Sequence, residues 1–264
     1  MTDISVREGK PKSRSAAGDG AQRRQRKSTT SSTARGGTRR RGTSAIRSTA
    51  TIGTRRQLLA DRAYTELRDR IVTLEIPPGA PIDEDLLGDE LKIGRTPVRE
   101  AIKRLALENL VTVYPRRGTF ASEINITDLA DVSDVRAQLE GHAAYRAAQR
   151  ITDTQRAELN QLLEDLGHSR GSDDVEKLMA LDARVHRFIY RCAGNPYLEE
   201  TLTRYFNLSL RIWHLVLDRL PHLFARVHEH DDLLRAIEAG DANKARMVVN
   251  EHIATFEREI RMVL

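Results

Sequence analysis

The stretch Gly94-Arg95-Thr96-Pro97-Val98-Arg99-Glu100-Ala101-Ile102-Lys103-Arg104-Leu105 decides how the rest of the chain is interpreted. It predicts a helix that Thr96 caps, with Pro97 at the first helical position, where a missing N–H costs nothing. Four apolar residues recur at helical spacing and form one stripe: Val98, Ala101, Ile102 and Leu105. Three cations share another face: Arg95, Arg99 and Lys103. Like charges at this spacing repel, so an anionic partner would explain them, although the helix alone is equally compatible with a solvated surface.

Two further helices are expected before this stretch. Residues 58–74 carry apolar side chains along one face, and the Pro-Pro-Gly at 77–79 ends that helix. Residues 83–91 form the second, with Asp83 as its cap. The three-residue turn 92–94 then leads into the cationic helix, which is expected to run to about residue 109. Two short helices joined by such a turn are typical of a helix-turn-helix, whose second helix enters the major groove of DNA.

A small β-hairpin is expected directly after the cationic helix. Residues 110–114 are β-prone, residues 115–118 form a turn with Arg116 and Arg117 at its tip, and residues 119–121 return. A hairpin with a basic tip in this position is a wing, which can reach the adjacent groove or the DNA backbone. The combined order of elements predicts a winged helix-turn-helix DNA-binding domain over residues 57–122.

The same region resembles the GntR family of bacterial transcription regulators. The resemblance rests on Pro77-Pro78-Gly79, Arg95-Thr96-Pro97-Val98-Arg99-Glu100-Ala101, Arg104-Leu105, Leu110-Val111 and Arg117-Gly118. It implies that the operator contacts come from the start of the recognition helix and from the wing tip, namely Arg95, Thr96, Arg99, Arg117 and Gly118. Some relatives also use an arginine on the preceding helix, but Asp85 stands at the matching position here, so we expect that contact to be absent.

Charge is distributed unevenly along the 264 residues. Residues 1–56 hold 15 Lys and Arg against 3 Asp and Glu, whereas the remainder holds 28 against 35, for a net charge of +5. This first segment has almost no large apolar side chains, so we expect a disordered basic arm that either binds phosphate or serves as a solubilising tail. A single cysteine, Cys192, excludes an intrachain disulfide framework. No apolar run is long enough to span a membrane and no secretory signal is present, so we expect a cytoplasmic, nucleoid-associated protein.

Residues 123–264 are expected to form a second domain, an all-α bundle of six or seven helices. The helices are expected over about 127–150 with a break near Ser133, from a cap at Asp153 or Thr154 to about 167, and from Asp173 to about 192. The remaining helices are expected from Asn195 to about 220, from Pro221 to 240, and from Asp241 to about 263. The fold class is therefore mainly α.

Histidines on different helices of this bundle suggest a metal site. Asp182 and His186 are four residues apart, on one helical face, while His230 and His252 lie on the last two helices. Spacing alone leaves the ligand set open, because the chain also offers His142, His168, His214, His222 and His228.

The bundle resembles the FCD ligand-binding domain of the FadR-like branch of the GntR family. The matching stretches include residues 134–141, 182–188, 193–195, 229–230, 236–242 and 251–252. The resemblance implies a divalent metal on Asp182, His186, His230 and His252, with zinc as the default and nickel or manganese as alternatives. It also implies that Arg136 pairs with the carboxylate of an effector. The alternative for Arg136 is a salt bridge to Glu140, and Asn195 is expected either to contact the effector or to cap its helix.

These expectations define a regulator and not an enzyme. We expect a homodimer that binds a palindromic operator in double-stranded DNA, as a repressor, and that responds to a small carboxylate effector. In a first alternative the metal is itself the signal. A metal-dependent hydrolase is disfavoured, because no glutamate lies in a motif such as His-Glu-x-x-His beside the ligands and a winged helix would be superfluous.

Overall fold

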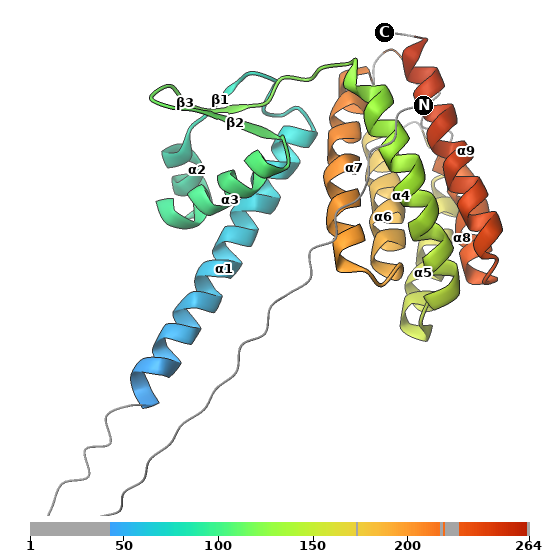
Figure 1. Ribbon diagram of the computed structural model, residues 1–264, viewed down its shortest axis with the longest axis horizontal. Coiled ribbons are helices and arrows are strands. Elements are labelled where there is room, and N and C mark those ends of the chain that lie inside the picture. The colour runs from blue at the N-terminus through green and yellow to red at the C-terminus, as the bar shows by residue number, and fades with distance from the viewer. Residues whose placement is uncertain (1–42, 173, 217–218, 220–226, 263–264) are drawn as a thin grey trace, which may run out of the picture. The chain divides into compact units, whose positions relative to one another are not determined.

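The fold is mainly α-helical, as the sequence predicted, with nine helices and one small sheet in the part of the chain that the structure describes. This computed structural model describes residues 43–172, 174–216, 219 and 227–262 (Figure 1). Most of the predicted basic arm, residues 1–42, lies outside the described residues. Residues 43–56, which we expected to belong to the arm, are helical instead. They contain no proline, and lengthening an existing helix needs no new nucleus.

The predicted helix-turn-helix is confirmed. It consists of α1 (Thr43–Val72), α2 (Glu84–Leu91) and α3 (Arg95–Leu107). Asp83 caps α2 as expected, since its side chain accepts hydrogen bonds from the backbone N–H groups of residues 85 and 86. The predicted apolar stripe of α3 is buried, together with one face of α1: Ala63, Leu67, Ile71, Val98, Ala101, Ile102 and Leu105. These side chains hold the cationic face of α3 outward.

The expected cap of α3 was wrong. Gly94 is the N-cap and makes no side-chain hydrogen bond, so the helix begins at Arg95 and Thr96 lies exposed within its first turn. The left-handed Lys92 ends α2, and the extended backbone of Gly94 starts α3 earlier than a Thr96 cap would allow. As a result Arg95 projects from the first turn of α3, where backbone N–H groups are unpaired and attract anions.

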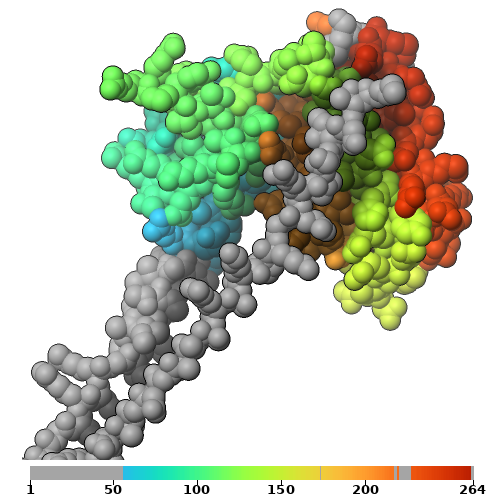
Figure 2. All heavy atoms as spheres, viewed as in Figure 1, coloured from blue at the N-terminus to red at the C-terminus, as the bar shows by residue number. Residues whose placement is uncertain are grey.

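The wing is also confirmed, with one addition. Strands β2 (Val111–Tyr114) and β3 (Gly118–Ala121) form the predicted antiparallel hairpin, and its tip protrudes from the surface (Figure 2). A third strand, β1 (Pro81–Ile82), pairs antiparallel with β3, so the strand order is β1-β3-β2. We did not predict β1, because a two-residue strand has no periodicity of its own. Gly118 has a φ of +107°, which favours glycine at the end of the turn.

The second region is the expected all-α bundle, with six helices among its described residues: α4 (Asp128–Arg150), α5 (Asp153–His168), α6 (Val175–Cys192), α7 (Pro196–Val216), α8 (His230–Glu238) and α9 (Ala242–Arg261). Helix α4 packs against α6, α7, α8 and α9, and it runs beside α9 over most of its length (Figure 1). The polar side chains of the bundle core therefore come from helices grouped around α4.

Several helix boundaries differ from those expected. Helix α4 is continuous through Ser133, and α5 is capped by Thr152 in a capping box with Gln155, not by Asp153 or Thr154. The cap of α6 is Asp174, while the expected cap, Asp173, lies outside the described residues. The predicted helix start at Pro221 lies outside them as well. Helix α8 begins at His230, after a single tight turn over residues 227–229.

Candidate metal centre and nucleic-acid interface

Helix α6 supplies the first two candidate ligands. Asp182 and His186 lie one turn apart on the face of α6 that is turned into the bundle, and they are 4% and 0% exposed. The same face carries Leu178, Val185 and Ile189, so apolar packing fixes the rotation of the helix. An aspartate and a histidine are thereby held in the core, where each needs a partner.

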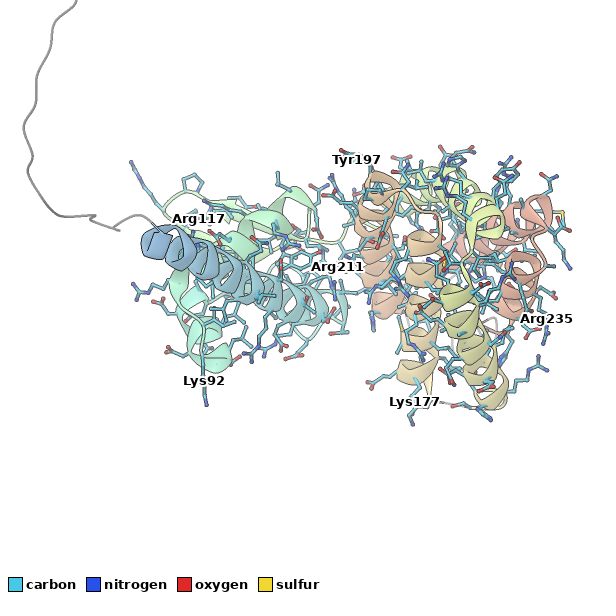
Figure 3. All side chains as sticks on the ribbon, turned by 90° about the horizontal axis from the view of Figure 1, so that it is seen from below. Lys92, Arg117, Lys177, Tyr197, Arg211 and Arg235 are labelled. Carbon is cyan, nitrogen blue, oxygen red and sulfur yellow. The ribbon has the colours of Figure 1, made fainter. Side chains whose placement is uncertain are left out.

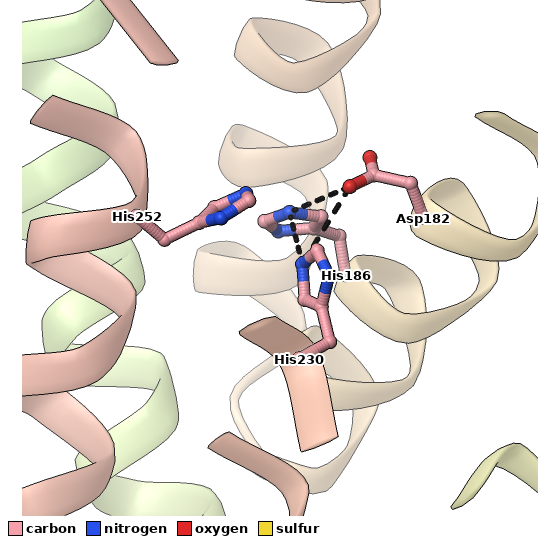
Figure 4. A group of neighbouring side chains, drawn as sticks. All are labelled: Asp182, His186, His230 and His252. Atoms are coloured by element: carbon pink, nitrogen blue, oxygen red, sulfur yellow. Dashed lines mark hydrogen bonds and ion pairs between the residues drawn. The ribbon is translucent and has the colours of Figure 1, made fainter. Parts of the chain in front are cut away.

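The structure brings all four predicted ligands together. One ligand atom from each of Asp182, His186, His230 and His252 lies within 4.8 Å of the other three, and all four residues are buried (Figure 4). They come from α6, α8 and α9. The Asp182 carboxylate lies 3.8 Å from Nε2 of His186 and 3.5 Å from Nε2 of His230. Among the described residues these four form the one group of three or more potential ligands that could hold a metal ion.

Neighbouring acceptors determine the tautomers of two rings. Nδ1 of His186 lies 2.7 Å from Oε2 of Glu140, and Nδ1 of His230 lies 2.9 Å from the backbone carbonyl of Val227. Carboxylate and carbonyl oxygens only accept hydrogen bonds, so both Nδ1 atoms carry the proton. Each Nε2 then presents a lone pair to the centre of the cluster. Histidine ligands in metalloproteins are oriented in the same way by an acceptor on the second nitrogen.

The donor set fits a divalent cation. The Nε2 atoms of His186 and His230 lie only 3.2 Å apart. Two lone pairs at that distance repel, whereas a tetrahedral zinc bound at about 2.0–2.1 Å would hold two nitrogens about 3.3–3.4 Å apart. The second oxygen of Asp182 is buried without a hydrogen-bond partner. His252 completes the group, and its own Nδ1 lies 3.4 Å from the Glu229 carboxylate.

Burial and neighbouring charges give residues in and beside the cluster the protonation states that cation binding requires. Burial, reinforced by the neighbouring His252 and His186, lowers the pKa of His230 well below 6.5, so this ring stays neutral. Burial alone would raise the pKa of Glu140, but Arg136 and then His186 outweigh it and lower that pKa to about 2. A neutral imidazole and an ionised carboxylate are the protonation states that metal binding requires.

Arg136 lies beside this cluster on α4. Its Nε donates to Oε1 of Glu140 at 2.6 Å, which is the salt bridge that the sequence offered as an alternative, and both side chains are buried. The guanidinium lies over the rings of Phe206 and Trp213, at 5.2 and 5.3 Å from their centroids. One of its outer nitrogens has no hydrogen-bond partner. Phe206 also contacts the His186 ring, with 4.8 Å between centroids, so Phe206 packs against both Arg136 and the cluster.

Of the two roles expected for Asn195, the structure shows helix capping. Its side-chain oxygen accepts hydrogen bonds from the backbone N–H groups of Tyr197 and Leu198, so it caps α7. An effector contact from Asn195 stays a prediction. Sequence analysis missed the second role of Glu140, which bridges Arg136 to His186. The spacing of four residues placed Glu140 beside Arg136, but no local signal indicated contact with a histidine 46 residues away.

The predicted DNA-contacting side chains lie on the exposed face of α3 and already have acidic partners. Arg95 forms an ion pair with Asp85 of α2 at 2.8 Å, and Arg99 forms one with Glu84 at 2.9 Å. Arg95 and Arg99 remain 72% and 65% exposed, so both guanidinium groups are accessible. Sequence analysis noted Asp85 only as a missing arginine. Its pairing with Arg95 was not foreseen, because it depends on how the turn brings α2 and α3 together.

The wing tip presents the second predicted group. Arg117 is exposed, and its guanidinium carbon lies 5.9 Å from the centroid of the Tyr114 ring of β2 (Figure 3 labels Arg117). Glu84 joins the wing to the recognition helix, because its other oxygen accepts a hydrogen bond from Thr119 of β3 at 3.1 Å. Gly118 and Thr96 are exposed too, so every residue predicted to contact DNA is accessible.

Two family models match the chain. Residues 59–121 match the model described as bacterial regulatory proteins, gntR family, and residues 131–255 match the FCD domain. The first match covers the helix-turn-helix and wing, and the second covers all four candidate ligands together with Arg136. Among the described residues, no helix has the length and hydropathy needed to cross a membrane.

Individual relatives agree with these matches. The chain is 33% identical over 136 residues to an HTH-type transcriptional regulator from the TAR-I ttuE-ttuC' intergenic region of Agrobacterium vitis, covering 50% of this chain and 79% of that protein. It is 24% identical over 207 residues to the Escherichia coli HTH-type transcriptional repressor RspR, covering 78% of this chain and 91% of that protein. The solved structure of E. coli McbR/YncC shares the fold, with a TM-score of 0.68, 24% identity, and coverage of 77% of this chain and 97% of that one. The chain therefore belongs to the gntR family of bacterial regulatory proteins and is a transcription regulator with an FCD domain.

Proposed function

We propose that this regulator is a repressor whose affinity for its operator is controlled by a small carboxylate bound beside a divalent metal in the helical domain. The convergence of Asp182 and three histidines, within 4.8 Å of one another, carries the proposal. Zinc suits three imidazoles and one carboxylate in a compact site, and nickel or manganese is an alternative. The protein is not proposed to be an enzyme.

The effector's carboxylate would be bound from two sides. The metal would accept one carboxylate oxygen in an additional coordination position. The outer nitrogen of Arg136 that has no partner would donate to the carboxylate. The aromatic wall of Phe206 and Trp213 beside Arg136 suits the apolar part of a small organic acid. Asn195 remains a candidate for a further contact.

DNA binding would use the exposed cationic face of α3 together with the wing. Arg95 and Arg99 would exchange their acidic partners on α2 for phosphate or guanine, Thr96 would contact a phosphate or a base edge, and Arg117 with Gly118 would contact the adjacent groove. A homodimer would place two such units on a palindromic operator. The name of the relative RspR, a repressor, supports the direction of regulation.

A second candidate function is metal sensing. It is favoured by the position of the ligands on three helices, α6, α8 and α9, because metal binding alone would tie these helices together. Titrating operator binding with zinc and with chelator, each with and without a panel of small carboxylates, separates the two functions. We expect release only when metal and carboxylate are both present. Release by metal alone would refute the effector model and favour the metal sensor.

A further inference from the structure

One buried carboxylate, Glu140, bonds to both halves of the ligand site. Its Oε1 accepts from Arg136 at 2.6 Å, and its Oε2 accepts from Nδ1 of His186 at 2.7 Å. We propose that Glu140 orients His186 for the metal and sets the charge of the site, so that the metal-loaded site accepts a single carboxylate group. This inference rests on the function proposed above and adds the chemical class of the effector.

The first part follows from the two contacts. Glu140 is 1% exposed, so water cannot replace it as the acceptor for His186. Without an acceptor at Nδ1, the imidazole could carry its proton on Nε2, where the metal has to bind. Loss of such an outer acceptor typically costs about 10- to 100-fold in metal affinity.

The second part follows from counting the buried charges around the cluster. In the metal-bound state, the described side chains of this group are Arg136 with a charge of +1, Glu140 and Asp182 with −1 each, and three histidines that bind as neutral imidazoles. The sum is −1, which becomes +1 when a divalent ion binds. A single carboxylate then makes the site neutral, whereas a second buried carboxylate would leave it at −1. Glu229 is 40% exposed beside His252, so solvent screens its charge.

Neutrality decides the ligand class because the side chains of the site are buried. An uncompensated charge in a protein core is costly, and water cannot enter to screen it. Glu140→Gln removes one negative charge, so the metal-loaded site would carry +2 and would favour a dianion. Propionate and malonate are suitable probes because both contain three carbons and they differ in having one or two carboxylate groups.

The experiment compares five full-length proteins: wild type, Glu140→Gln, Arg136→Gln, Glu229→Gln, and a double variant with Arg136→Gln and Glu140→Leu, which has no hydrogen-bond acceptor at residue 140. The double variant avoids an unpaired guanidinium in the core, and it therefore keeps the zinc-affinity test valid if Glu140→Gln alone folds poorly. Glu229→Gln is the matched control, because it also changes a carboxylate beside a histidine ligand, but at 3.4 Å and partly in solvent. Zinc affinity is measured by competition with a chromogenic chelator. Affinities for propionate and malonate are measured by calorimetry on zinc-loaded protein freed of excess metal.

We expect zinc affinity to fall about 10- to 100-fold in the double variant, which has no acceptor at residue 140. Zinc affinity should fall less in Glu140→Gln, whose amide oxygen can still accept from His186, and should change little in Glu229→Gln. Arg136→Gln should retain zinc, since His186 keeps Glu140 as its acceptor. The same variant should lose propionate, since it lacks the guanidinium that binds the carboxylate. The ratio of malonate to propionate affinity should rise in Glu140→Gln by on the order of tenfold or more.

The following results would overturn the inference. Wild-type zinc affinity in both Glu140 variants would show that Glu140 does not orient His186. An unchanged preference between malonate and propionate in Glu140→Gln would remove Glu140 from the control of charge. Zinc-loaded wild type that binds neither acid would refute the statement that the site accepts a single carboxylate group. Wild-type protein that takes up no divalent metal at all would refute the proposed function together with the inference. Metal uptake by the wild type with no effect of Glu140→Gln would refute the inference alone.

Discussion

Acidification should destabilise the metal-free protein through His230. This ring is buried, and its burial, with His252 and His186 nearby, holds its pKa well below the ordinary value of 6.5. The folded protein therefore keeps His230 neutral, whereas the unfolded chain binds a proton at this residue below about pH 6.5. The unfolded state then binds more protons, so stability rises with pH in this window and is lost as the pH falls through about 6.5.

The magnitude follows from the proton that only the unfolded chain binds. For one such group, each pH unit below its pKa in the unfolded chain lowers the free energy of unfolding by about 1.4 kcal/mol. Lowering the pH from about 7.5 to about 5 should therefore remove about 2 kcal/mol through His230 alone. For a chain of this size, that corresponds to a fall of about 4–8 °C in the unfolding midpoint.

The assay is urea unfolding in chelator at both pH values for wild type, His230→Gln and His142→Gln. His142 is exposed on α4, so its substitution should leave the pH dependence unchanged. Between the two pH values, the free energy of unfolding should fall by about 2 kcal/mol less in His230→Gln than in the wild type. The comparison concerns the change with pH and not the starting stability, which glutamine will also alter. An equal loss in His230→Gln and wild type would show that His230 is not kept neutral by the fold.

Three further predictions concern DNA and metal. Arg99→Ala should weaken operator binding roughly 5- to 150-fold. The melting temperature should stay nearly unchanged, because the ion pair of Arg99 with Glu84 is exposed. Fluorescence anisotropy with operator and random duplexes measures the affinity, and an unaltered affinity would remove Arg99 from the interface. His230→Ala should lower the bound metal, measured by atomic emission, with metal-free operator binding largely retained, and full metal occupancy would contradict the ligand assignment. Deleting residues 1–55 should reduce the slope of log affinity against log salt if this basic segment contacts phosphate, and an identical slope would leave it no role in binding.

Sequence patterns predicted the elements better than their ends. The apolar stripe of α3 was correctly assigned because burial follows helical periodicity, and Val98, Ala101 and Leu105 are fully buried. The cap was misassigned because Thr96 is a good capping residue by type, while the preceding turn places Gly94 at the helix start. Similarly, Thr152 caps α5 in competition with two other suitable residues that follow it. Neighbouring residues of equal capping ability cannot be ranked without the path of the backbone.

The candidate site shows the same limit at longer range. Spacing along one helix identified the Asp182 and His186 pair, and the family resemblance selected His230 and His252 from a larger set of histidines. The contact of Glu140 with His186 joins α4 to α6, and the contact of Glu84 with both Arg99 and Thr119 joins α2, α3 and β3. Such bridges depend on how helices and strands pack together, and no local pattern in the sequence encodes them.

The energetic cost of the buried cluster is itself an argument for a ligand. A bundle of this size would be more stable with apolar side chains in place of an ion pair, an aspartate and three histidines, because buried ionic groups seldom recover their desolvation energy. The cluster also leaves polar atoms without partners, on Asp182 and on Arg136. A cation would bind the unpartnered oxygen of Asp182, and a carboxylate would accept from the unpartnered nitrogen of Arg136. Each ligand would stabilise the folded protein to an extent that grows with its occupancy. Because Glu140 bonds to both sides, the two ligands should bind cooperatively. Linkage then requires the effector to raise metal affinity by the same factor as the metal raises effector affinity, so measuring either factor predicts the other.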